Sequence, residues 1–264
     1  MAHQIGNILF LNAGGGVSIN ADVATYIMYK NLMPLCTVLE GGDIAPLHDN
    51  LTNIFYTGPS GVTDIELQLP SAQTINCFAV AGANLLSAAT SISFYLWDAD
   101  TSAYYLVVTA TSGRDNQPVM VVFENQISTK IKITITSAAA FQIGEMAFGQ
   151  CLKMPASPSV GLQPARWNTE DEITHHATQS NYNGRSTINT RGNKEVLPFN
   201  LIPHEWMRTT WATFIDEAKG LPIWVGWNQD LYPNECIYGS WEQDTAGYSS
   251  PLFAKFTLTV KGQA

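Results

Sequence analysis

The stretch that decides the fold is Lys130-Ile131-Lys132-Ile133-Thr134-Ile135-Thr136, in which isoleucine occupies every second position. Side chains of a β-strand point alternately to opposite faces, so this pattern predicts a strand with one buried and one solvated face. The same alternation recurs in Ile65, Leu67 and Leu69, and again in Ile92, Phe94 and Leu96. The centre of the first half of the chain is therefore predicted to be antiparallel β-sheet.

Short apolar runs and turn signals extend this pattern on both sides. The runs 75–80, 104–108 and 119–123 are rich in β-branched or aromatic residues. Gly58-Pro59 and Asp98-Ala99-Asp100 are typical turn sequences. Many short strands at near-even spacing predict a β-sandwich or jelly roll.

The second half of the chain is predicted to be an antiparallel sheet or barrel with one helix. Apolar residues recur at helical spacing between Pro203 and Lys219, and Gly220 and Pro222 are typical of a helix end. Strands are predicted before and after the helix, at 196–202, 223–227, 236–241 and 253–260. Such a helix is expected to pack on one face of the sheet.

The composition of the chain changes near Met154, and the segment 154–159 has the Pro and Ser content of a linker. We therefore expect an N-terminal strand or hairpin segment at 1–30, a β-sandwich at 31–154 and a β domain with helix 203–219 at 155–264.

Charge and hydropathy exclude several classes of function. The net charge is −9 and basic residues are not clustered, which argues against nucleic-acid binding. No apolar run approaches the roughly 20 residues that span a bilayer, so membrane insertion is not expected. Charged residues make up only 13% of the chain. Two explanations stay open for this value: a surface covered by other subunits, or a β-rich surface of Ser, Thr and Asn.

No motif in the chain predicts a cofactor, a metal centre or an enzyme. The cysteines at 36, 77, 151 and 236 lack the paired spacing of zinc sites, and buried free thiols are expected. His175-His176 is interpreted as part of a surface loop, because neighbouring side chains rarely share one metal. Asn12–Gly16 lacks the residues of a phosphate loop and is interpreted as a tight turn. Asp43 and Asp49 could form an acid pair, but a sandwich alone does not place carboxylates across a cleft.

The stretch from about Asn31 to Leu152 resembles a discoidin-type, galactose-binding-like β-sandwich. The resemblance is carried by Leu47–Phe55, Asp64–Leu69, Val80–Leu85, and the closing segments Lys132–Ile135 and Ile143–Gly149. It implies a jelly-roll sandwich with ligand-binding loops. The candidate residues for contact with a host-surface glycan are His48, Asp49, Asn50, Phe55, Trp97, Asp98, Asp100 and Tyr104. Aromatic faces and polar side chains are what a sugar requires.

The stretch from about Pro164 to Gly262 resembles minor or distal tail proteins of long-tailed bacteriophages. The resemblance is carried by Asn183–Ser186, the helix Trp206–Lys219, Pro222–Asn228, Tyr232-Pro233 and Phe256–Gly262. It implies a β-barrel with a flanking helix that assembles into a homo-oligomeric ring, a hexamer or a trimer. The expected ring interface consists of Trp206, Trp211, Trp224, Trp227 and Trp241.

Together the two resemblances predict a mainly β structural protein of a virion tail tip or baseplate. Such a protein is made in the host cytoplasm, and its partners are the tail tube, the tail hub and possible host-surface glycans. Two alternatives are kept: a host-glycan-binding module, and an enzyme that hydrolyses cell-envelope glycans.

Overall fold

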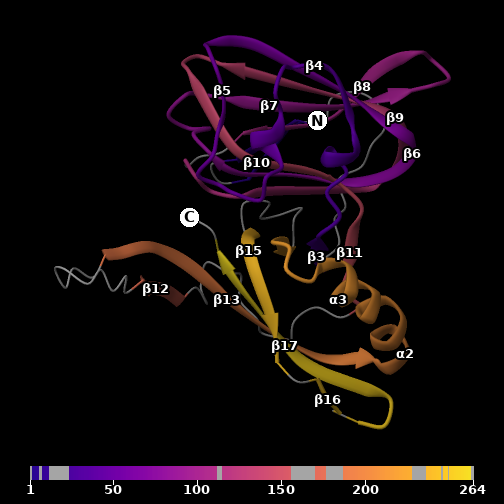
Figure 1. The fold of residues 1–264 in the computed structure, drawn as a ribbon. Coiled ribbons are helices and arrows are strands. Elements are labelled where there is room, and N and C mark those ends of the chain that lie inside the picture. The colour runs from indigo at the N-terminus through magenta and orange to yellow at the C-terminus, as the bar shows by residue number, and fades with distance from the viewer. Residues whose placement is uncertain are drawn as a thin grey trace.

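The structure is a computed structural model that describes residues 2–5, 8–11, 24–111, 115–155, 170–176, 187–227, 236–244, 246–248 and 250–262. Its described strands form two antiparallel sheets (Figure 1). The first sheet contains β1 (Ala2–Ile5), β2 (Ile8–Leu11), β4 (Thr37–Glu40), β5 (Tyr56–Gly58), β6 (Gly61–Ala83), β7 (Ser91–Asp98), β8 (Ala103–Thr111), β9 (Val119–Ser137) and β10 (Phe141–Gly149). The second contains β3 (Thr25–Met28), β11 (Cys151–Lys153), β12 (Glu170–His176), β13 (Thr187–Pro203), β14 (Ile223–Trp227), β15 (Cys236–Gln243), β16 (Gly247–Tyr248) and β17 (Phe253–Gly262). A mainly β chain with one longer helical segment, as the sequence predicts, is confirmed.

The two long strands β6 and β9 fold the first sheet into a sandwich. They pair antiparallel from Gly61↔Ser137 to Val80↔Val119, and the register shifts where Gln68 is followed by Gln73. On one side of this shift β4 and β7 complete a layer, and on the other side β10 does so. A bulge lets a strand bend, so one pair of strands contributes to both layers.

The core of the sandwich consists of the alternating apolar residues that the sequence singles out. Ile65, Leu67, Ile131, Ile133 and Ile135 are all fully buried in one cluster. The rings of Phe78 and Phe94 stack in the same cluster with their centroids 4.7 Å apart. Period-2 alternation therefore places the buried face correctly.

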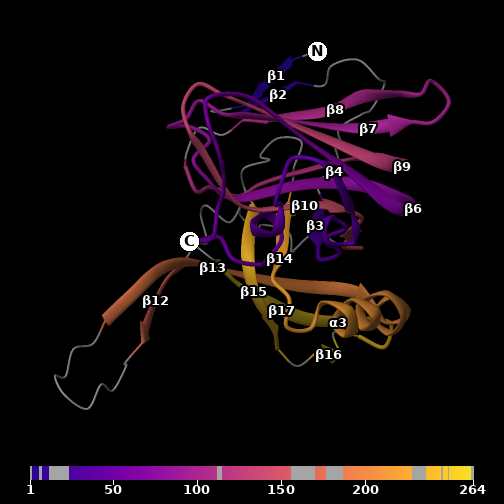
Figure 2. The same ribbon diagram turned by 45° about the horizontal axis from the view of Figure 1, so that its top comes forward.

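The layer of the sandwich that contains β10 is buried on its outer face as well as on its inner face. In β6, Phe78 and Val80 point into the sandwich, whereas Cys77, Ala79 and Ala81 belong to a different buried cluster. We call this second cluster the interlayer cluster. It consists of Ala24, Tyr26, Met28, Cys77, Ala79, Ala81, Met120, Val122, Ala147, Cys151, Trp224, Cys236 and Tyr238. Small side chains on β6 and β10 let the second sheet approach closely, so the sandwich and the second sheet share a core (Figures 1 and 2).

The strands that border the sandwich in sequence pair within the second sheet. β3 and β11 pair with each other, and β3 also pairs with β14. The described strands of this sheet run in the order β11-β3-β14-β15-β17-β13-β12, with β16 beside β17. The sequence did not distinguish an antiparallel sheet from a barrel. In the structure these strands pair as an open sheet.

A helical segment covers the other face of the second sheet. It consists of α2 (His204–Trp206), one turn of π-helix η3 (Met207–Trp211) and α3 (Ala212–Ala218), and it agrees with the predicted helix 203–219. Phe214 and Ala218 are fully buried against the sheet. The segment therefore forms the last layer of the molecule, after the two layers of the sandwich and the second sheet.

The tryptophans predicted at a subunit interface lie largely inside the chain. Trp211 is 0% and Trp224 is 3% exposed, so the prediction that these two residues lie at a ring interface is wrong. Trp211 belongs to the helix-facing core and Trp224 to the interlayer cluster. Trp206 and Trp241 are half-buried against the helix-facing core, and the side chain of Trp227 lies outside the described residues. The chain's own sheets and helix bury Trp211 and Trp224, so these two indoles need no other subunit to cover them.

The structure also places the cysteines and the pair His175-His176. Cys77, Cys151 and Cys236 are buried free thiols as expected, whereas Cys36 is half-buried. His175-His176 lies in strand β12, so the loop predicted there is wrong. Asn12–Gly16 and most of the predicted linker lie outside the described residues. No helix among the described residues is long and apolar enough to cross a membrane.

Two short turns of 3-10 helix, η1 (Met33–Leu35) and η2 (Ala45–Leu47), lie at the N-terminal border of the sandwich. Each buries one side chain, Met33 and Leu47, in the sandwich core. The segment that follows η2 carries the first group of predicted ligand residues.

Candidate functional site

The hairpin of β7 and β8 brings Trp97 and Tyr104 together. Trp97 and Tyr104 are directly paired across the two strands, and their rings meet edge to face at 5.1 Å. Asp98 shapes the turn between the strands: its carboxylate accepts the backbone N–H of Asp100 at 2.9 Å and the hydroxyl of Thr101 at 2.8 Å. The hairpin turn that the sequence predicts at Asp98–Thr101 is therefore confirmed, and both Asp98 carboxylate oxygens are used in building it.

Two residues of β9 hold Trp97 in place. The hydroxyl of the buried Ser128 accepts the backbone N–H of Trp97 at 3.1 Å and donates to its carbonyl at 3.0 Å. The ammonium of Lys130 lies 4.8 Å from the centre of the Trp97 ring, which is a cation–π distance. The indole is thus fixed on the outer face of the sandwich, with a positive charge over it.

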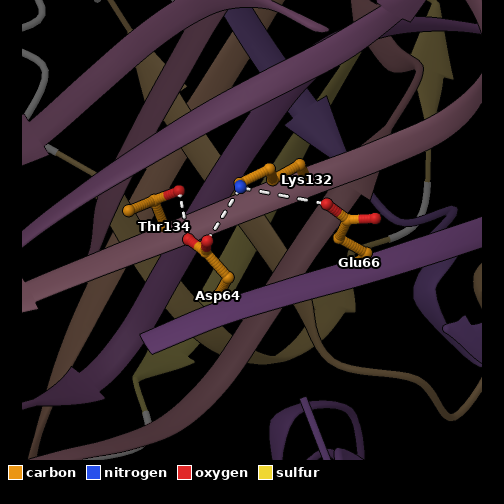
Figure 3. A network of polar contacts seen from close by, with 4 residues as sticks. All are labelled: Asp64, Glu66, Lys132 and Thr134. Atoms are coloured by element: carbon orange, nitrogen blue, oxygen red, sulfur yellow. Dashed lines mark hydrogen bonds and ion pairs between the residues drawn. The ribbon is translucent and has the colours of Figure 1, made fainter. Parts of the chain in front are cut away.

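A charged network continues across the same face (Figure 3). Lys132 Nζ lies 2.7 Å from Asp64 Oδ2 and 3.8 Å from Glu66 Oε1, and the Thr134 hydroxyl donates to Asp64 Oδ1 at 2.6 Å. These side chains point outward because Ile65, Ile131 and Ile133 between them point into the core. We call Asp64, Glu66, Trp97, Tyr104, Lys130, Lys132 and Thr134 together the Trp97 face.

The aromatic and charged residues of the Trp97 face shift one another's pKa values. Burial raises the pKa of Tyr104 to about 12, and the charge of Glu66 and a hydrogen bond to it add to the shift. Burial works against ionisation of Asp64, but hydrogen bonds from Lys132 and Thr134 outweigh it, so the pKa of Asp64 is lowered. The hydrogen bond to Asp64 raises the pKa of Lys132. At neutral pH the face therefore presents fixed charges of both signs beside two aromatic rings.

The residue types of this arrangement are suited to the recognition of a polar ligand. Aromatic rings offer apolar faces to C–H groups, and carboxylates and ammonium groups exchange hydrogen bonds with hydroxyls. The side chains of Asp64 and Lys132 are only about a quarter exposed, so their hydrogen bonds are partly shielded from water. Within the part of the chain that the structure describes, no group of three or more His, Cys, Asp or Glu residues could hold a metal ion.

The second group of predicted ligand residues follows η2 and contacts other strands. The backbone N–H of Asn50 donates to Glu145 Oε2 on β10 at 2.9 Å, and Asp49 Oδ1 accepts the N–H of Leu51 at 2.8 Å. Phe55 is 38% exposed, and Leu51 and Ile54 are exposed as well. The segment 48–55 is thus anchored by its backbone and turns apolar side chains outward.

Close backbone approach explains the glycines beside this segment. A Cβ on Gly144 would lie 2.6 Å from the Thr52 carbonyl oxygen, and one on Gly82, at φ +63°, would lie 2.7 Å from it. Glycine is the residue type that fits such contacts. The 48–55 segment is therefore seated against the ends of β6 and β10, whereas Trp97 contacts β9 and pairs with Tyr104.

The sequence pattern predicted part of this arrangement. The predicted residues Trp97, Asp98, Asp100 and Tyr104 come together in one hairpin, and His48, Asp49, Asn50 and Phe55 lie in the other segment. It missed Asp64, Glu66 and Lys132, although the alternation of 64–69 and 130–136 already placed their side chains on the solvated face. The register that sets these side chains against one another could not be read from either stretch alone.

Glu145, whose carboxyl group is only 1% exposed, was not among the residues that the sequence pattern singled out. Burial raises the pKa of Glu145 to about 8, the hydrogen bond from Asn50 works against this shift, and the charge of Asp49 adds to it. The hydroxyl of Tyr238 in the second sheet is buried without a hydrogen-bond partner, and burial followed by the charges of Glu145 and Asp49 raises its pKa. The one signal in the sequence that could have identified Glu145 is its position as a charged residue within the apolar segment 141–148.

Comparisons with known proteins give similarity of fold over about half of the chain. No family model matches, and no curated protein matches. A family 32 carbohydrate-binding module from Streptococcus pneumoniae EndoD is 12% identical, with a TM-score of 0.38, over 46% of this chain and 99% of that module. Chitosan-binding module 1 of a Paenibacillus sp. IK-5 chitosanase/glucanase is 17% identical, with a TM-score of 0.36, over 46% and 99%.

A pectin-binding carbohydrate-binding module is 15% identical, with a TM-score of 0.36, over 51% of this chain and 96% of that one. Similarity at this level says nothing about a ligand of this chain, and the fold described above rests on its own strand pairing. None of the structures named here is a phage tail protein.

Proposed function

We propose that the chain is a binding protein that recognises a hydroxyl-rich ligand, such as a glycan, on the Trp97 face. The observation that carries the proposal is the fixed Trp97–Tyr104 pair beside the Asp64–Lys132–Glu66 network. A sugar ring can stack on an aromatic side chain while its hydroxyls bond to carboxylate and ammonium groups. A preformed site of this kind binds without a large ordering cost.

The test is glycan-array screening of the full chain, followed by calorimetry with each ligand found. Trp97→Ala should weaken binding at least tenfold, because it removes the stacking surface and the partner of Lys130. Phe55→Ala is the matched control, since Phe55 is an exposed aromatic residue in the other predicted ligand segment. Unchanged affinity in Trp97→Ala together with lost affinity in Phe55→Ala would assign the site to segment 48–55 instead. No binding to any glycan by the folded chain would overturn the proposal.

Strand β4 supports a second proposed function, that of a structural subunit in a homo-oligomeric ring such as a phage tail tip. β4 pairs with β6, and all four of its residues are exposed. Val38 is 37% and Leu39 is 53% exposed in this strand, and Leu35, two residues before it, is 60% exposed. Exposed edges with apolar side chains are prone to pair with another chain.

Light scattering on the purified chain tests this second function. We expect an oligomer that Leu39→Lys reduces to smaller species, because a charge at an apolar edge opposes association. A monomer at every concentration would exclude self-assembly through this edge, and imaging of tail particles with an antibody against the chain would decide a virion location.

A further inference from the structure

Three of the four cysteines meet in the interlayer cluster. Cys77 lies on β6 in the sandwich, while Cys151 on β11 and Cys236 on β15 belong to the second sheet. Cys77 is 0% exposed, and Cys151 and Cys236 are each 8% exposed. Thiols from three strands thus converge at the place where the two sheets share a core.

Cys77 and Cys151 are the closest pair by topology. Cys77 is paired with Gly149 at the end of β10, and the chain crosses to the second sheet and reaches Cys151 two residues later. The side chain of Asn76, the neighbour of Cys77, accepts the backbone N–H of Cys151 at 2.9 Å. The pairing of Cys77 with Gly149 and the bond from Cys151 to the side chain next to Cys77 thus place the two cysteines side by side.

Cys36 stands apart from this group. Its thiol donates to the Leu32 carbonyl at 3.5 Å, and its side chain packs against the sandwich core. The chain therefore contains its own control: one thiol outside the cluster and three within it.

We propose that Cys77 and Cys151 are a site of oxidative modification, at which hydrogen peroxide converts the two thiols into a disulfide that joins the sandwich to the second sheet. In the first step the Cys151 sulfur is oxidised by peroxide to a sulfenic acid, and one water leaves. In the second step the Cys77 sulfur displaces the hydroxyl from Cys151, so the S–S bond forms and a second water leaves. Two thiols and one peroxide thus give one disulfide and two waters.

The order of these steps follows from exposure. Both cysteines are buried, but Cys151 is 8% exposed and Cys77 is 0% exposed, so Cys151 is the more accessible of the two to peroxide. Burial raises the pKa of Cys77, with smaller contributions from Cys151 and Cys236, so Cys77 is a thiol and a poor first target for peroxide. In the second step its proton leaves with the displaced hydroxyl as water. Such a bond would close the loop from β6 to β11 and restrict the unfolded chain, which stabilises the fold.

The experiment treats the reduced full chain with hydrogen peroxide, alkylates the remaining thiols and maps peptides without reduction. We expect a Cys77–Cys151 linked peptide, loss of two of the four free thiols, and a higher Tm that dithiothreitol reverses. Cys36→Ser and Cys236→Ser should retain the linked peptide, and Cys151→Ser should lose it. If Cys151→Ser does not fold, the wild-type peptide map and the reversible Tm shift still decide.

Three results would overturn the proposal. The first is a folded chain whose four thiols all stay reactive after peroxide. The second is a linked peptide that contains Cys236 instead of Cys151, and the third is over-oxidation of Cys151 while Cys77 stays free. Because none of these readouts involves a ligand, they are independent of the outcome of the glycan-binding test.

Discussion

At the scale of single residues, the most unusual group in the chain is the buried carboxyl of Glu145. Its carboxyl accepts a hydrogen bond from the Asn50 backbone N–H, and the charge of Asp49 adds to the effect of burial in raising its pKa. A carboxyl group that loses water without gaining a positive partner is driven to its neutral form.

We predict that Glu145 makes the free energy of unfolding depend on pH. Its pKa is about 8 in the folded chain against an ordinary value of 4.5, so the folded state holds the proton more tightly. The stabilising contribution of protonated Glu145 to the free energy of unfolding is complete below pH 4.5 and is lost as the pH rises through 8. Glu145→Gln should match the wild type in Tm at pH 5 and exceed it at pH 8.5, in thermal melts followed by circular dichroism. Equal Tm values at both pH values would contradict the assignment.

A second prediction concerns Tyr104 on the Trp97 face. Its pKa of about 12 is due first to burial and then to Glu66, so Glu66→Gln should lower the pKa but leave it above the ordinary value of 10. Nuclear magnetic resonance of ring-labelled tyrosine measures this titration, with Tyr104→Phe to assign the signal. A pKa that does not move would show that Glu66 does not contact this hydroxyl.

At the scale of elements, β10 fixes the position of segment 48–55. Gly144 leaves room for the Thr52 carbonyl, while Glu145 next to it holds the Asn50 backbone. The segment is therefore oriented by a strand far away in the sequence.

We predict that Gly144→Ala destabilises the chain by about 1–3 kcal/mol, because the new Cβ would overlap the Thr52 carbonyl oxygen. Gly247→Ala is the control, since a Cβ there meets only the Lys255 side chain, at 3.7 Å. Urea unfolding of both variants makes the measurement. A Gly144→Ala variant as stable as the control would mean that segment 48–55 moves aside freely.

At the scale of the whole molecule, the interlayer cluster ties the sandwich to the second sheet. The outer face of the second layer presents Cys77, Ala79, Met120 and Val122, and the second sheet covers them. The sandwich alone would therefore expose an apolar face to water.

We predict that a fragment of residues 31–154 associates or binds a hydrophobic dye, whereas the full chain does not. The fragment keeps the sandwich core but lacks β3 and the strands after residue 170 that cover the interlayer cluster. Dye fluorescence and size-exclusion chromatography test this, with the full chain as control. A monomeric fragment that binds no dye would show that the sandwich is complete without the second sheet.

The amino-acid sequence by itself determined the local features. Alternation in 64–69 and 130–136 fixed the strands and their buried faces, and helical spacing with Gly220 fixed the helix, because these signals act between residues close in the chain. It also identified Trp97 and Tyr104 as candidate ligand residues that belong together, since a short turn can be read between them.

Only the tertiary structure decided which residues lie beside one another on the outer face of the sandwich, and which residues are buried between the two sheets. The register of β6 against β9 placed Lys132 beside Asp64 and Glu66, and the packing of the two sheets buried Trp224, Glu145 and three thiols. A tryptophan pattern looks the same whether the chain's own strands or a neighbouring subunit covers it. Contacts between residues far apart in sequence depend on how the layers stack, and local periodicity carries no information about that.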